Sequence, residues 1–226
     1  MTVTILKGID CFATIRPEWV PELKARGYGF AARYYRRAPL TGGRGNAVSK
    51  EEVAALHENG LAFLPVYQNT SNEVSYFTQV NAMADALAAV LKAEQMGQPE
   101  GTDIFFAVDC DPAPFDIDQI KYYFEILNSL PTLRRWEVSA YGSGAVCAAL
   151  KDEGLAKHTW LSNAKGWRGY QEWLPKADVV QTTLPFTLPF GLEVDGNECR
   201  NDRCLWKPEV PIPPAVSWFK RIWGWF

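Results

Sequence analysis

Two carboxylates follow directly on an apolar segment in the middle of the chain. Residues 102–108 read Thr-Asp-Ile-Phe-Phe-Ala-Val, and Asp109 and Asp111 come next. Such a run is typical of a strand buried on both faces of a parallel sheet. Alternate strand residues point the same way, so we expect the two carboxylates to project together, about 6.6 Å apart along the strand. A turn at Pro112 would explain Asp111 but not Asp109. The pair predicts catalysis at the carboxyl end of a barrel strand.

Two further acids stand at the ends of predicted strands. Asp10 ends the first strand and Asp195 ends the last. In a closed barrel these strands are neighbours, so both acids should face Asp109 and Asp111 across the mouth. Glycoside hydrolysis needs such paired carboxyl groups, and crowding raises the pKa of some of them. Simpler interpretations remain, because Asp10 could cap the next segment and Asp195 could belong to an Asp-Gly turn.

The elements that would position these acids alternate along the chain. The expected helices are 17–26, 50–59, 76–96, 117–130, 143–153 and 167–174. Between them, apolar runs predict eight strands: 7–10, 29–35, 62–67, 104–109, 137–141, 159–162, 179–181 and 192–195. This alternation predicts an α/β fold, a single (β/α)8 TIM barrel over residues 3–207. The later helices should be irregular, because the Pro-rich stretch 182–189 leaves no room for a regular seventh helix.

The C-terminal residues differ in character from the predicted barrel. Residues 208–214 form a Pro-rich linker, and residues 215–226 form an aromatic amphipathic tail with Lys220 and Arg221. The tail could pack over a seam of the barrel. We favour an interfacial membrane anchor, in which four aromatic side chains meet the membrane surface: Trp218, Phe219, Trp223 and Trp225.

Composition excludes several classes of function. A net charge of −3 and a pI near 5.5 argue against a nucleic-acid partner. The chain has two histidines and no Cys/His cluster with zinc-site spacing, so no metal or other cofactor is implied. Of the five cysteines, Cys11, Cys110 and Cys147 should be buried thiols. Cys199 and Cys204 could form a disulfide in an oxidising compartment.

Three motifs together resemble those of a known family. Gly8-Ile9-Asp10, Phe106-Ala107-Val108-Asp109-Cys110-Asp111 and Val194-Asp195-Gly196-Asn197 are similar to motifs of the lysozymes of glycoside hydrolase family 25. They resemble more closely the glycoside-hydrolase-like domain relatives of those lysozymes. Weaker markers agree in order: 65–67, 141–143, 160–162 and 180–181. The resemblance implies a TIM barrel over most of the chain.

The resemblance also implies site residues. Asp10, Asp109, Asp111 and Asp195 match the family's acidic residues, and four others match positions that line its sugar groove: Tyr67, Tyr141, Trp160 and Gln181. The lysozymes place Glu where this chain has Asp111, whose side chain is one methylene shorter. Their Trp on the seventh strand is replaced by Val180.

These features lead to two competing hypotheses. The first is a muramidase-like lysin or toxin that hydrolyses glycosidic bonds in bacterial peptidoglycan. In it, Asp111 is the general acid, Asp109 stabilises the developing charge, and Asp10 and Asp195 bind the sugar. The alternative is a non-catalytic glycan-binding or membrane-active protein on the same barrel. The N-terminus lacks a classical signal peptide. We therefore expect synthesis in the cytoplasm and action in the periplasm or cell wall after release or secretion.

Overall fold

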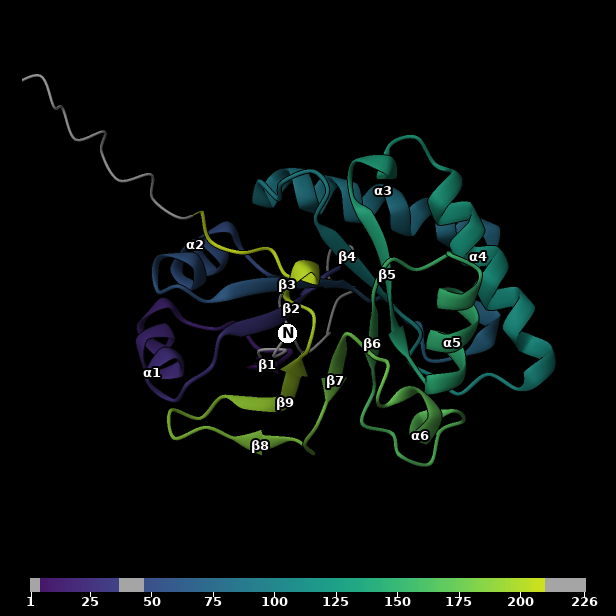
Figure 1. Ribbon diagram of the computed structural model, residues 1–226. Helices are drawn as coiled ribbons and strands as arrows, with labels where there is room; N and C mark the ends of the chain where they lie inside the picture. Colours follow the sequence, from purple (N-terminus) through teal and green to yellow (C-terminus); the bar gives the residue numbers. More distant parts are fainter. Residues whose placement is uncertain (1–4, 37–46, 210–226) are drawn as a thin grey trace, which may run out of the picture.

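Eight strands of the described residues close into a barrel (Figure 1). The structure is a computed structural model that describes residues 5–36 and 47–209. The order around the barrel follows the sequence, and the last strand pairs back onto the first. The strands are β1 Leu6–Asp10, β2 Phe30–Tyr35, β3 Ala62–Tyr67, β4 Asp103–Ala107, β5 Glu137–Gly142, β6 Thr159–Leu161, β7 Val179–Gln181 and β9 Glu193–Cys199.

The last barrel strand differs from the prediction. Strands β1 to β7 are parallel, whereas β9 runs antiparallel to both β7 and β1. A parallel return needs a long crossover, usually a helix. The chain instead passes through β8 Phe186–Thr187, which forms a hairpin with β9, and β9 then runs back along β7. The expected (β/α)8 TIM barrel is therefore correct as a closed barrel in a mixed α/β fold, but not as eight regular βα units.

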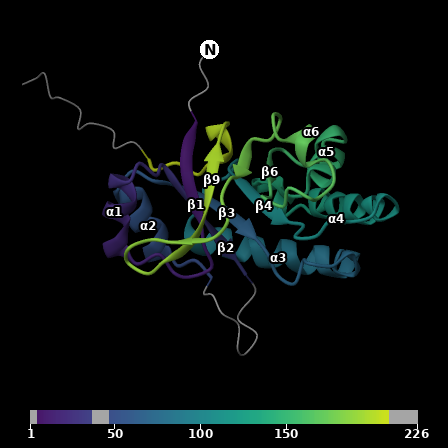
Figure 2. The same ribbon diagram turned by 90° about the horizontal axis from the view of Figure 1, so that it is seen from below.

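Six α-helices of the described residues lie outside the barrel (Figures 1 and 2). Ser49, Thr78 and Ser143 begin three of them, each accepting a hydrogen bond from the backbone N–H three residues on. The helices are α1 Val20–Ala25, α2 Lys50–Glu58, α3 Gln79–Met96, α4 Ile117–Ser129, α5 Gly144–Asp152 and α6 Tyr170–Trp173. Short 3-10 turns add η1 Pro17–Trp19, η2 Val74–Tyr76, η3 Pro114–Asp116, η4 Leu133–Arg135 and η5 Asp202–Cys204.

The strand alternation separates two apolar regions. One fills the barrel and includes Phe30, Leu64 and Phe105; the other lies between the strands and the helices and includes Phe63 and Phe106. Every residue of β3 and β4 is buried, so the sequence of these strands does not alternate between apolar and polar residues.

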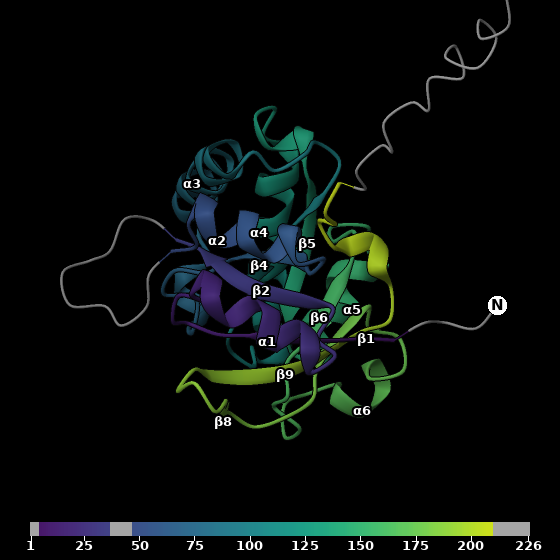
Figure 3. The ribbon, with the colours of Figure 1, turned by 90° about the vertical axis from the view of Figure 1, so that its left-hand side faces the viewer.

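The two ends of the barrel are finished differently. The β8–β9 hairpin lies beside α1 (Figure 3), where the ring of Phe190 stacks on that of Trp19 at 5.0 Å between centroids. At the opposite end, where the parallel strands begin, the segment after β9 packs against the base of the barrel. There Trp206 forms a backbone bridge with Phe63, and Cys204 and Leu205 fill the base of the interior.

Part of the predicted C-terminal region lies outside the described residues. The linker 208–214 is described only as far as residue 209, and the tail with Trp218, Phe219, Trp223 and Trp225 is not described. Nothing in the described structure supports binding to a membrane surface. Among residues 5–36 and 47–209, no helix combines the length and apolar character needed to cross a bilayer.

Candidate active site

A cavity of about 200 Å³ opens at the carboxyl ends of the parallel strands. Its wall combines carboxylates with aromatic rings and amide side chains, as expected of a site that binds a polar ligand with flat faces. Ten residues line it: Asp10, Phe12, Tyr34, Val66, Gln68, Asp109, Tyr141, Trp160, Gln181 and Asp195. Of the eight residues predicted for the site, six therefore line this cavity.

Asp10 and Asp195 are direct cross-strand partners in the β1–β9 pair. Asp195 lies near the start of β9, not at its end, and it reaches the mouth of the barrel because β9 runs antiparallel. Like charges placed opposite each other destabilise a sheet. Such a pair beside a cavity is typical of a functional site, where carboxyl groups with perturbed pKa values gather.

Asp10 is almost fully buried, with 3% of its surface exposed. Its Oδ2 accepts hydrogen bonds from Asn197 Nδ2 at 2.7 Å and from Gln181 Nε2 at 3.1 Å. The Tyr34 hydroxyl donates more weakly to Oδ1 at 3.5 Å. Burial, and to a smaller extent the charge of Asp195, raises the pKa of Asp10 to about 7, although the hydrogen bond from Asn197 lowers it. Asp10 therefore carries a proton in a large share of molecules at neutral pH.

Asp109 follows β4 after a short gap and also lines the cavity. Its backbone N–H donates to Ser71 O at 2.9 Å, and its carboxylate accepts from Gln68 Nε2 at 3.1 Å. Burial raises the pKa of Asp109, while the hydrogen bond from Gln68 lowers it. The pKa of Asp195 is also raised, by burial first and by the charge of Glu193 second.

Asp111 pairs with Arg168 and is not among the residues that line the cavity. Its Oδ2 accepts from the backbone N–H of Arg168 at 3.1 Å, and its Oδ1 lies 3.5 Å from Arg168 Nε. Strand β4 ends at Ala107, two residues earlier than expected. Asp109 and Asp111 therefore lie beyond the strand, and the alternation of strand side chains does not make them point the same way. The structure does not bring Asp111 into the lining of the cavity.

Three of the four predicted sugar-contacting residues line the cavity. The Tyr141 hydroxyl lies 3.4 Å from Gln181 Oε1, and Trp160 Nε1 donates to Asn197 Oδ1 at 2.9 Å. Tyr67 lies elsewhere, because it faces the helices while its neighbour Val66 faces the barrel interior. The Tyr67 hydroxyl donates to Asp85 Oδ1 in α3 at 2.9 Å.

Four lining residues were missed by sequence reasoning, together with one residue that holds Asp10. Phe12 and Tyr34 stack with centroids 4.6 Å apart and planes 4° apart, and the Arg36 guanidinium lies 4.9 Å from the centre of the Phe12 ring. The others are Val66, Gln68 and Asn197. Asn197 could have been found, because it stands two residues after Asp195 on one strand and so shares its face.

A buried ion pair holds the loop that follows Asp10. Arg33 Nε lies 2.6 Å from Glu52 Oε1, and both side chains are inaccessible to solvent. Arg33 Nη1 also donates to the carbonyls of Cys11 at 2.7 Å and Phe12 at 2.8 Å, and Glu52 accepts from the N–H of Ile15 at 2.9 Å. These contacts hold the loop that places Phe12 in the wall of the cavity.

The acids of the site do not form a metal-binding group. Within the described ranges, no cluster of three or more His, Cys, Asp or Glu side chains could hold a metal ion. Asp10 is surrounded by amide and hydroxyl donors, which favour its ionised form, while burial favours its protonated form. The carboxyl groups of Asp10, Asp109 and Asp195 are placed where they could donate a proton to a ligand in the cavity or accept one from it.

The fold is shared with proteins of solved structure. The Tat-secreted protein Rv2525c of Mycobacterium tuberculosis, crystallised with L-tartrate, superposes with a TM-score of 0.72 at 21% identity, over 88% of this chain and 96% of that one. The modular autolysin LytC of Streptococcus pneumoniae, solved with a synthetic peptidoglycan ligand, gives a TM-score of 0.54 at 14% identity, over 88% of this chain and 47% of LytC. At these identities the likeness shows a common fold.

Sequence comparison extends the likeness to a family. The uncharacterized protein YbfG of Bacillus subtilis (strain 168) is 30% identical over 172 residues, which are 72% of this chain and 24% of YbfG. The chain thus spans about a quarter of the length of that relative. The family model for the Rv2525c-like, glycoside hydrolase-like domain matches residues 21–199 and includes Asp109, Asp111 and Asp195. Because this match covers most of the chain, the protein belongs to the Rv2525c-like, glycoside hydrolase-like domain family.

Proposed function

We propose that the cavity binds a glycan of the bacterial cell wall and hydrolyses one of its glycosidic bonds. One observation carries this proposal: three carboxyl groups with raised pKa values, Asp10, Asp109 and Asp195, line one aromatic-walled cavity. Glycosidases need one carboxyl group that keeps its proton and another that is ionised. Different degrees of burial in one cavity can supply both states.

The roles follow from the surroundings of each acid. Asp10, with a pKa of about 7, is the proposed general acid in place of Asp111, because its proton is available near neutral pH. It would donate that proton to the glycosidic oxygen as the bond to the anomeric carbon breaks. Ionised Asp109 would stabilise the positive charge that develops on the sugar. Water then adds to the anomeric carbon, and its proton returns to Asp10.

The sugar itself would be held by rings and amides. Tyr141 offers a flat apolar face and is supported by the buried ring of Trp160, 4.9 Å away between centroids. Gln181 and Gln68 offer hydrogen bonds to hydroxyl or acetamido groups. Peptidoglycan is the proposed substrate, supported by the likeness of the three acidic motifs to family 25 lysozymes and by the fold shared with LytC. The proposed place of action is the periplasm or cell wall, in line with the secretion of Rv2525c.

A second candidate function is glycan binding without hydrolysis. The pairing of Asp111 with Arg168 favours it, because the acid that the lysozyme motif would use is occupied by a cation. Asp111 is also one methylene shorter than Glu, and a displacement of about 1 Å can cost on the order of a hundredfold in rate. Both candidate functions use the same cavity, and they differ only in whether the bound glycan is hydrolysed.

Digestion of purified peptidoglycan sacculi, followed by mass spectrometry of the fragments, separates the two candidates. For hydrolysis we expect new reducing ends with the wild type and about a hundredfold fewer with Asp10→Asn or Asp109→Asn. Asp111→Asn is the matched control, and its activity should fall less than tenfold if Asp10 is the acid. If the wild type releases no fragments but still sediments with the sacculi, the protein binds the glycan without hydrolysing it. Neither fragments nor sedimentation would refute both.

A further inference from the structure

Two buried cysteines lie close together at the base of the barrel, at the end opposite the cavity. Cys199 ends β9 and Cys204 belongs to the 3-10 turn η5, and their sulfur atoms are 3.9 Å apart. Neither side chain is accessible to solvent. A disulfide needs sulfur atoms about 2.05 Å apart, so closure requires a shift of about 2 Å within one short turn.

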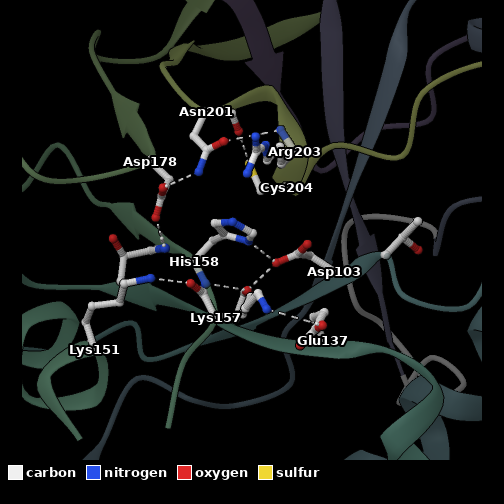
Figure 4. Close-up of polar contacts among 12 residues, drawn as sticks. Asp103, Glu137, Lys151, Lys157, His158, Asp178, Asn201, Arg203 and Cys204 are labelled. Carbon is white, nitrogen blue, oxygen red and sulfur yellow. Dashed lines mark hydrogen bonds and ion pairs between the residues drawn. The ribbon is translucent and has the colours of Figure 1, made fainter. Parts of the chain in front are cut away.

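The turn between the two cysteines is already held in place. The N–H of Arg200 donates to Asp178 O at 2.7 Å, and Asn201 Nδ2 donates to Asp178 Oδ1 at 2.8 Å (Figure 4). Cys204 Sγ donates to Asn201 O at 3.0 Å. These contacts keep both sulfur atoms on the same side of the turn, which lowers the entropic cost of joining them.

The two thiols also differ in reactivity. The contact between the two sulfur atoms lowers the pKa of Cys199, whereas the same contact and burial raise the pKa of Cys204. An asymmetric pair of this kind supplies one thiolate that attacks and one thiol that resolves.

The other three cysteines lack these features. Burial raises the pKa of Cys11 to about 12 and that of Cys110 to about 11, and it also raises the pKa of Cys147. The sulfur of Cys11 lies 3.4 Å from Ala13 O, and that of Cys147 lies 3.8 Å from Gly142 O. Each of the three is a single thiol without a cysteine partner.

We propose that Cys199 and Cys204 form a redox-active dithiol, which closes to a disulfide in an oxidising environment and locks the segment 200–206 against the base of the barrel. That segment carries Leu205, which packs in the barrel interior, and Trp206, which forms the backbone bridge to Phe63 near the start of β3. The disulfide would tie this cover to β9, the strand that closes the barrel.

The chemistry is a thiol–disulfide exchange with an external disulfide, either a small molecule or a protein. Because both sulfur atoms are buried in the closed protein, the exchange takes place when the segment 200–206 opens from the base of the barrel. The Cys199 thiolate then attacks one sulfur of that disulfide and releases the other as a thiolate. Cys204 then loses its proton and attacks the Cys199 sulfur of the mixed disulfide, which releases the second external thiol. The two protein thiols are oxidised, and the external disulfide is reduced to two thiols.

Peptide mapping tests the bond directly. The reduced full chain is incubated with glutathione disulfide, unfolded, alkylated and digested with trypsin without reduction. Because trypsin cuts after Arg200 and Arg203, the bond joins two otherwise separate peptides and releases residues 201–203. A background of Cys110→Ser removes the half-exposed thiol and should keep the joined peptides. Adding Cys199→Ser should abolish them.

Thermal unfolding gives a second readout that does not need the serine replacement at Cys199. Oxidised protein in the Cys110→Ser background should melt about 5 °C above its reduced form, and dithiothreitol should reverse the shift. Alkylation of both Cys199 and Cys204 after incubation with the oxidant would overturn the proposal. A bond from either cysteine to Cys11 or Cys147, or an unchanged melting temperature, would also overturn it.

Discussion

At the scale of single residues, the site depends on how burial acts on Asp10. The carboxyl group has three hydrogen-bond donors around it, which favour the ionised form, yet its pKa is raised to about 7 because burial outweighs them. Asp111 has a different environment, with Arg168 beside it. The chemistry of these acids therefore depends on the neighbours of each side chain more than on residue type.

The raised pKa of Asp10 makes a prediction about stability. In the folded protein Asp10 keeps its proton up to about pH 7, whereas in the unfolded chain it loses it near its ordinary value of 3.8. Its contribution to stability is thus complete below about pH 4 and is lost as the pH rises through 7. Asp10→Asn keeps an oxygen that accepts from Asn197 and Gln181 but does not titrate.

We expect the Asp10→Asn variant to lose this pH dependence. Between pH 4 and pH 8 the wild type should lose up to about 4 kcal/mol more stability than the variant. Urea unfolding at pH 4, 6 and 8 measures the difference. Asp118→Asn, at an exposed position of α4, is the control and should follow the wild type. Parallel curves for Asp10→Asn and the wild type would contradict the raised pKa.

At the scale of elements, side chains on the outer face of the barrel support the site. Arg33 on β2 and Glu52 on α2 lie outside the barrel interior, but together they hold the loop between β1 and α1. Removing one partner of a buried ion pair leaves the other charge buried and unpaired, which is more costly than removing both. The cavity wall at Phe12 thus depends on residues that never touch the cavity.

Glu52→Gln should therefore destabilise the protein by about 3–5 kcal/mol. The double variant Arg33→Met with Glu52→Leu should recover a large part of that loss, because neither charge then remains buried. Glu22→Gln is the matched control: its pair with Arg26 has a similar distance, 2.8 Å, but both side chains are exposed. It should change stability by less than about 1 kcal/mol. Equal losses from Glu52→Gln and Glu22→Gln in urea unfolding would refute the structural role.

At the scale of the whole molecule, the barrel is closed by two segments that follow its parallel part. Strand β9 joins β7 to β1, and the segment after it covers the base through Trp206. The Trp206 ring contacts Phe63 at 5.7 Å and His57 at 4.9 Å between centroids, and only 7% of the residue is exposed. Closure at the base and the cavity at the mouth therefore involve separate sets of residues.

Trp206→Ala should lower the free energy of unfolding by about 3–5 kcal/mol, because it leaves a void beside Phe63 and His57, between β3 and α2. Glycan binding at the mouth should change little at a temperature where the variant is folded. Urea unfolding measures the first effect, and sedimentation with sacculi measures the second. A loss of binding in proportion to the loss of stability would show that the base and the mouth are coupled.

The sequence by itself determined where most of the barrel strands lie. Strands β3 and β7 have the predicted bounds, and β5 is one residue longer than predicted, because apolar runs between turn residues mark buried strands. Asp10 and Asp109 could be assigned to the mouth of a barrel for the same reason, whereas the rings of Tyr141 and Trp160 were assigned through the resemblance to family 25 lysozymes. The local sequence pattern was sufficient to predict a strand wherever the strand ran parallel to its neighbours, as in regular βα units.

Only the tertiary structure decided the direction of β9, the facing side of Tyr67 and the partner of Asp111. A strand has the same two-residue period in either direction, so its pattern does not reveal which way it runs. On a strand buried on both faces, the pattern does not show whether Val66 or Tyr67 points inward. Beyond the end of β4, Asp111 is directed by Arg168, a residue 57 positions later in the chain. The raised pKa of Asp10 likewise depends on burial beneath side chains from β2, β7 and β9, which meet only when the barrel closes.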